Sequence, residues 1–204
     1  MKFVAIIALL TALGCVGPRS TQSPPPRDSQ APPTTGKTSR ETPSAQQPDR
    51  KQSQISEGYA MLYELVSKQT GLDRALVLGG GMNDQTKALI REIADVSKQA
   101  VAKIRGFAQA DPSLGLKQTG LPEVELKARA EIESSITRRL LFAGKNFEVR
   151  LLLSQSDATE YGAALARELA ERDADPQRRA WLKEFADRYG KLRERVEQRL
   201  TVRK

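Results

Sequence analysis

Few residues of this chain have the chemistry of an active site. Its 204 residues include no histidine and only one cysteine, Cys15. The most frequent general base, the most frequent metal ligand and any internal disulfide are therefore excluded. No spacing marks a serine, lysine or carboxylate as a nucleophile or proton donor. We predict no catalytic residues, no cofactor and no enzyme activity, which leaves covalent modification of Cys15 and oxygen ligation by carboxylates.

Oxygen ligation would depend on glutamates near apolar stripes. The candidates are Glu64, Glu92, Glu133, Glu148 and Glu160. Carboxylates alone can hold a hard cation, and Glu92 and Glu148 are the residues on which a metal-handling or catalytic bundle would depend. The alternative for each is a solvated position on a helix, and no motif gathers them. We therefore predict no metal site.

Cys15 ends an apolar segment at the start of the chain. Met1 and Lys2 precede an apolar run from Phe3 to Leu10 that continues to Leu13. The run is too short to span a bilayer and has the length of a signal-peptide core. The sequence Ala12-Leu13-Gly14-Cys15 resembles the lipobox of bacterial lipoproteins. The alternative is an ordinary secretory signal that carries a chance cysteine.

The lipobox resemblance implies how the chain is processed and where it is located. Residues 1–14 would be a signal peptide cleaved between Gly14 and Cys15, and Cys15 would carry the acyl chains, palmitate among them, that bind membrane lipid. No aspartate follows Cys15, since Val16 and Gly17 come next. By the same resemblance this favours a lipid anchor in the outer membrane of the bacterial envelope. We expect the helical part on the periplasmic side, with the cell surface as the alternative.

Residues 15–52 have the composition of a tether. They hold eight of the eleven prolines of the chain, among many serines, threonines and glutamines, with no apolar periodicity. Such a segment buries too little apolar surface to offset the entropy of ordering it. We predict a disordered segment with polyproline II character.

Residues 53–204 show helical periodicity throughout. We predict helices over about 53–70, 72–78, 83–108 and 122–172, and a last one from Pro176, with a break in the fourth near Gly144 or in 154–157. Asn83 or Asp84 is expected to cap the third helix. The apolar stripes predict an all-α fold, an antiparallel up-and-down bundle of four to five helices.

Within this bundle the segment 147–153 is apolar on nearly every side, which predicts that Glu148 and Arg150 are partly buried.

A bundle of this size resembles the ferritin-like architecture. The di-iron centre of that architecture requires histidines, so the resemblance implies a metal-free relative, by architecture only.

Charge and the end of the chain bear on partners. The net charge is +8, half of it in residues 1–54, and the bundle mixes acids with bases. No pairing of aromatic and basic residues indicates nucleic-acid binding. The surplus favours binding to anionic headgroups or wall polymers.

The terminal Arg203-Lys204 resembles the end of the murein lipoprotein, which implies possible wall attachment through Lys204. The alternative is a basic helix end that complements the helix dipole. A noncatalytic binding or scaffold protein of the envelope is the function we expect, with a peptidoglycan-attached or peptidoglycan-associated lipoprotein as the alternative.

Overall fold

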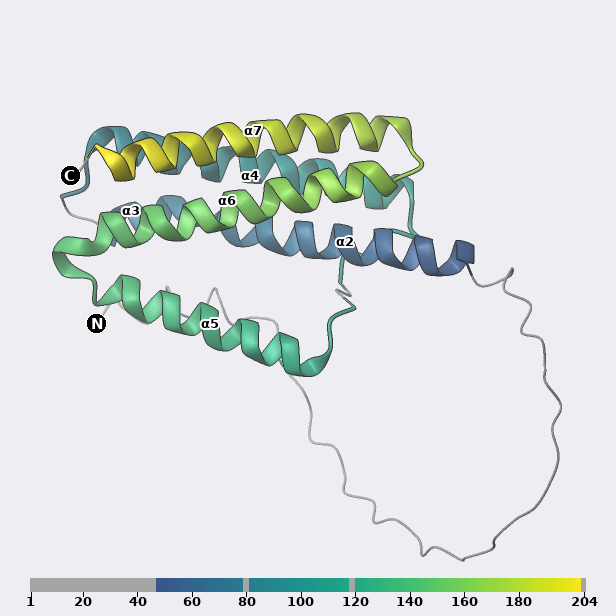
Figure 1. Cartoon of the computed structure of the whole chain (residues 1–204), viewed down its shortest axis with the longest axis horizontal. Coiled ribbons are helices and arrows are strands. Elements are labelled where there is room, and N and C mark those ends of the chain that lie inside the picture. Colours follow the sequence, from purple (N-terminus) through teal and green to yellow (C-terminus); the bar gives the residue numbers. More distant parts are fainter. Residues whose placement is uncertain (1–46, 79–80, 118–119, 203–204) are drawn as a thin grey trace, which may run out of the picture. The chain divides into compact units, whose positions relative to one another are not determined.

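The structure is a computed structural model, and it describes residues 47–78, 81–117 and 120–202. Over these residues the fold is all-α, and the predicted helical bundle is confirmed (Figure 1). The elements are α2 (Gln47–Gln69), α3 (Leu72–Leu78), α4 (Asp84–Ala110), α5 (Glu123–Leu141), the short 3-10 helix η1 (Gly144–Asn146), α6 (Phe147–Arg172) and α7 (Pro176–Thr201). The predicted signal peptide, Cys15, Lys204 and residues 15–46 of the predicted tether lie outside the described residues. Residues 47–52, assigned to that tether, belong to α2.

Four of the helices form the bundle. Helices α4 and α6 each contact both α2 and α7, and neighbouring helices run antiparallel (Figure 1). Helix α5 returns the chain from the end of the bundle at which α4 ends to the end at which α4 begins, and α6 starts there. One long crossover is a known way to connect a four-helix bundle. The bundle is thus complete without α5.

Polar side chains fix the helix starts that the sequence predicted. Asn83 caps α4, because its side-chain oxygen accepts a 2.9 Å hydrogen bond from the amide of Gln85. Asp175 caps α7 through a 2.8 Å bond from the amide of Arg178, and Pro176 occupies the first turn. Each cap satisfies an amide that has no partner within its own helix.

The predicted interruption of the long helical segment lies near Gly144. This residue has φ +51°, in the left-handed region that glycine adopts without steric cost, and η1 separates α5 from α6. No second break occurs in 154–157, because α6 runs without interruption to Arg172.

The core lies between the four bundle helices. Its largest fully buried side chains include Tyr59 and Leu62 from α2, Ile90 and Ile93 from α4, Leu151 and Leu152 from α6, and Tyr189 and Leu192 from α7. The stripes predicted for α2, α4 and α7 supply much of this core, as expected. The stripe predicted for 122–141 does not, since α5 has no buried residue.

The two charged residues predicted to be partly buried differ in the structure. Glu148 is 4% exposed, which confirms the prediction, whereas Arg150 is exposed and the prediction for it is wrong. Successive residues of a helix point about 100° apart. The first turn of α6 therefore places Glu148 among core residues and directs Arg150 to solvent.

None of the described helices combines the length and the apolarity needed to cross a bilayer.

Candidate functional site

The glutamates considered as metal ligands are not gathered in the structure. Glu92 forms an ion pair with Arg195 at 2.7 Å. Glu148 accepts a 2.6 Å hydrogen bond from the Thr86 hydroxyl and a 3.3 Å bond from the amide of Asn83. Glu148 thus fastens the start of α6 to the start of α4.

The other three candidates also have basic or hydroxyl partners. Glu64 and Glu133 both accept from Lys68, and Glu160 lies 3.2 Å from Arg193. Of the five candidates only Glu64 and Glu133 are brought together, and the ammonium group of Lys68 already lies between them. Within the described parts of the chain no three ligand-bearing side chains form a group that could hold a metal ion.

Sequence reasoning missed a buried polar cluster at the end of the bundle where α6 gives way to α7. We call it the Asp173 cluster, and its members are Tyr59, Asp111, Asp173 and Arg178. Arg178 donates two 2.8 Å hydrogen bonds to the carboxylate of Asp173 and one of 2.7 Å to Asp111. The Tyr59 hydroxyl donates a 2.7 Å bond to Asp173. The cluster therefore joins α2, the end of α4 and the α6–α7 connection.

The electrostatics of this cluster indicate a structural role. Burial alone would raise the pKa of Asp173, but hydrogen bonds from Arg178, the Asp175 amide and Tyr59 outweigh it, and the pKa is lowered. Burial and the neighbouring Asp173 carboxylate raise the pKa of Tyr59. Asp173 stays ionised and Tyr59 stays protonated at neutral pH, so neither is suited to exchange protons there.

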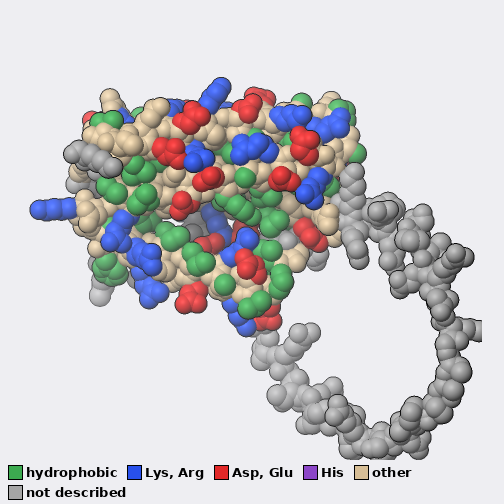
Figure 2. All heavy atoms as spheres, in the orientation of Figure 1, with side chains coloured by type: hydrophobic (Ala, Val, Ile, Leu, Met, Phe, Trp, Pro, Cys, Tyr) green, Lys and Arg blue, Asp and Glu red, His purple; other side chains and the backbone are tan. Residues whose placement is uncertain are grey.

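Helix α5 is the element whose surroundings suggest binding. Exposed large apolar side chains occur along α5, in the adjoining turn and on α6: Val124, Leu126, Ile132, Ile136, Leu141, Phe142, Leu153 and Tyr161. Figure 2 shows hydrophobic side chains along this side of the unit, interspersed with charged ones. Exposed apolar side chains gathered on one side of a unit are typical of interaction sites.

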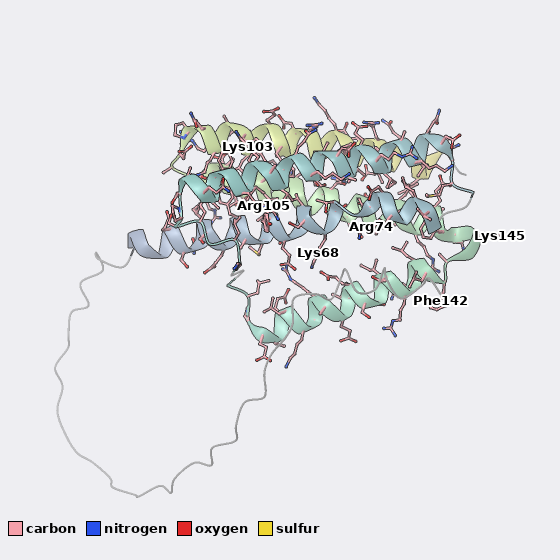
Figure 3. All side chains as sticks on the ribbon, turned by 180° about the vertical axis from the view of Figure 1, so that it is seen from behind. Lys68, Arg74, Lys103, Arg105, Phe142 and Lys145 are labelled. Atoms are coloured by element: carbon pink, nitrogen blue, oxygen red, sulfur yellow. The ribbon has the colours of Figure 1, made fainter. Side chains whose placement is uncertain are left out.

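Polar contacts hold α5 to the bundle. Lys68 projects from α2 toward α5 (Figure 3), where it donates to Glu133 while also donating a 2.6 Å bond to Glu64 of its own helix. Burial would lower the pKa of Lys68, but the bonds to the two glutamates outweigh it and the pKa is raised. Ion pairs as exposed as these contribute little to stability, so Lys68 holds α5 only weakly.

Basic residues gather where α5 turns into α6. We call this region the basic tip: Arg138, Arg139, Leu141, Phe142, Lys145 and Arg150. All four cations are exposed, and none forms an ion pair with any carboxylate of the described residues. Phe142 is 86% exposed. The basic tip can therefore present positive charge and an aromatic ring to a partner together.

A substitution on α5 checks that its apolar residues belong to the surface. Ile132 is 58% exposed, so Ile132→Ala should change the free energy of unfolding by less than about 0.5 kcal/mol. Ile93 is fully buried in α4, and the matched change Ile93→Ala should cost about 3 kcal/mol. Urea unfolding of both variants is the measurement. Equal costs would place Ile132 in the core and contradict the surface assignment.

Comparison of this chain with protein-family models, with curated proteins and with solved structures gave no match in any of the three.

Proposed function

We propose that this protein is a lipid-anchored protein of the bacterial envelope and that its helical unit is a noncatalytic binding or scaffold module. The observation that carries the proposal for the helical unit is α5, a helix of 19 residues with none of them buried. Of its apolar side chains Leu140 packs against the core, whereas the larger ones listed above are exposed. A helix that exposes so many apolar side chains is better explained by a partner than by stability.

The carboxylates support a noncatalytic role. Glu92 and Glu148 are held by partners on other helices. Asp173 is buried, ionised and hydrogen-bonded by Arg178 and Tyr59, which favours a structural role. Elemental analysis of the purified protein should therefore find no stoichiometric metal. Stoichiometric metal, lost on Glu92→Gln or Glu148→Gln, would overturn the noncatalytic assignment in favour of the metal-handling alternative.

The anchor rests on Cys15 and the residues before it. The apolar segment that ends in Ala12-Leu13-Gly14-Cys15 resembles a lipobox, and the chain has no second cysteine. Acyl chains contribute about 0.8 kcal/mol for each buried methylene, so two or three of them anchor a protein stably. Residues 16–46 would then separate the helical unit from the outer membrane.

The anchor is tested on the protein isolated from its own cells. Mass spectrometry should find Cys15 as the first residue, carrying a diacylglycerol on sulfur. Cys15→Ser should remain unprocessed, whereas Thr11→Ser in the same apolar segment should be processed normally. An intact Met1 or a free thiol at Cys15 in the isolated protein would refute the anchor and leave the assignment of the helical unit to be judged by α5 alone.

A further inference from the structure

We propose that the basic tip docks on the surface of an anionic lipid bilayer, with Phe142 inserted among the headgroups and the cations beside their phosphates. Phe142 and Lys145 project from the end of the unit at which α5 turns into α6 (Figure 3). Because the turn lies at one end of the unit, a flat surface can approach it. No rearrangement of the bundle is needed for this contact, because Phe142 is already exposed.

Charge favours an anionic partner at this place. Residues 134–156 contain four cations and one acid, Glu148, which is buried and hydrogen-bonded to Thr86. In the first half of α5 the signs are reversed, since 123–133 contains four glutamates against Lys127 and Arg129. Positive charge is thus concentrated at one end of α5. A basic segment near an anionic membrane gains about fivefold in partitioning for each Lys or Arg.

The apolar part of the basic tip distinguishes a bilayer from a soluble polyanion. Phe142 follows Leu141 directly, and the two side chains are 86% and 37% exposed. Gly144 at φ +51° turns the chain immediately after them, so they lie at the apex of a hairpin. An acidic polymer without rings or apolar groups would be bound by the cations alone, whereas a bilayer offers an apolar layer into which an aromatic ring can insert.

This contact is separate from the proposed acylation of Cys15. It uses only residues of the helical unit, whose core lies wholly between Ile55 and Val196 among the described residues. The polypeptide from Val16 to Lys204 carries the basic tip without the acylated cysteine. Its behaviour therefore tests the basic tip whether or not Cys15 is lipidated.

The experiment is co-sedimentation of this polypeptide with vesicles. Vesicles of phosphatidylcholine with phosphatidylglycerol should bind it at low salt, and vesicles of phosphatidylcholine alone should bind it far less. The triple change Arg138→Gln, Arg139→Gln and Lys145→Gln should weaken binding about a hundredfold. Phe142→Ala should weaken it about tenfold.

Matched control variants distinguish the effect of the basic tip from that of any loss of positive charge or apolar surface elsewhere on the unit. Arg179→Gln, Lys183→Gln and Lys191→Gln remove the same charge from exposed positions of α7, and Val124→Ala shortens a side chain that is 75% exposed on α5. Both variants should bind within about twofold of the parent. All the altered side chains are exposed, so circular dichroism and urea midpoints should be unchanged throughout.

Three results would overturn the proposal. One is equal binding to neutral and anionic vesicles. Another is an equal loss in the α7 triple variant, which would show nonspecific attraction. The third is undiminished binding by Phe142→Ala together with complete competition by soluble polyglutamate, which would assign the basic tip to a soluble polyanion.

Discussion

Replacing Asp173 by alanine is expected to lower the free energy of unfolding by about 3–5 kcal/mol, the cost of removing one partner from a buried ion pair. The side chain of Asp173 is 0% exposed, and that of Arg178 is 13% exposed. Asp173→Ala would leave the guanidinium with Asp111 as its remaining acidic partner at 2.7 Å, and the hydroxyl of Tyr59 without its acceptor. Both groups would then be buried with unsatisfied donors.

Urea unfolding of the Val16–Lys204 polypeptide measures this effect. Asp187→Ala is the matched control, because Asp187 is an exposed acid on α7 and its loss should cost less than about 0.5 kcal/mol. Asp173→Asn keeps the shape of the side chain and should fall between the two. A cost below about 1 kcal/mol for Asp173→Ala would show that the Asp173 cluster contributes little to stability.

The same cluster sets how stability depends on pH. The pKa of Asp173 is lower in the folded protein than in the unfolded chain, where an aspartate titrates near 3.9. The stabilisation that ionised Asp173 contributes is therefore complete above the pKa of the unfolded chain. It is lost as the pH falls through the pKa of Asp173 in the folded protein. For Tyr59 the pKa is raised, so its contribution is present below about pH 10 and is lost as the pH rises. Asp173→Asn should flatten the acid side of the stability profile and leave its neutral region parallel to that of the parent.

Much of the fold follows from local signals. Asn83 and the pair Asp175-Pro176 mark helix starts because capping chemistry is short-range, and Gly144 marks a break because only glycine adopts the left-handed region freely. These features need no knowledge of distant residues. The Asp173 cluster does, since Tyr59 lies 114 positions away along the chain.

The role of α5 shows where periodicity stops being informative. A stripe of apolar residues predicts that a helix has one apolar face, but it does not tell what that face contacts. Ile93 and Ile132 hold equivalent places in their stripes, yet one is fully buried and the other is 58% exposed. The difference arises because α2, α4, α6 and α7 already enclose the core, which leaves α5 as the connection between α4 and α6.

The basic tip was hidden for the same reason. Its residues lie within 138–150, a range that belongs to the predicted helix 122–172, and apart from Gly144 no sequence signal separates them from the rest of that helix. The break at Gly144 ends α5 just after Phe142, and the structure shows this ring exposed beside Lys145. The surplus of positive charge can be counted from the sequence. That no acid is exposed among these cations follows only from the burial of Glu148, which the structure shows.

Introducing a side chain at Gly162 of α6 is expected to be the second most damaging change, because the ring of Tyr189 from α7 lies against this glycine. A Cβ at this position would lie 2.9 Å from two ring carbons of Tyr189 and 3.0 Å from Leu65. Tyr189 cannot move aside easily: it is fully buried, its hydroxyl is hydrogen-bonded to Ser97 at 2.6 Å, and its ring centroid lies 4.2 Å from that of Phe185. Gly162→Val should therefore cost about 3 kcal/mol by overpacking.

Gly106 provides the control for helix propensity. It lies within α4, and a Cβ there would meet nothing within 4 Å. Gly106→Val should be neutral or slightly stabilising, since valine is a better helix former than glycine. Urea unfolding of the two variants isolates the steric effect, because both exchange the same residues within a helix. If Gly162→Val proved as harmless as Gly106→Val, α6 and α7 would have room to separate, and the close packing of the bundle around Tyr189 would have to be rejected.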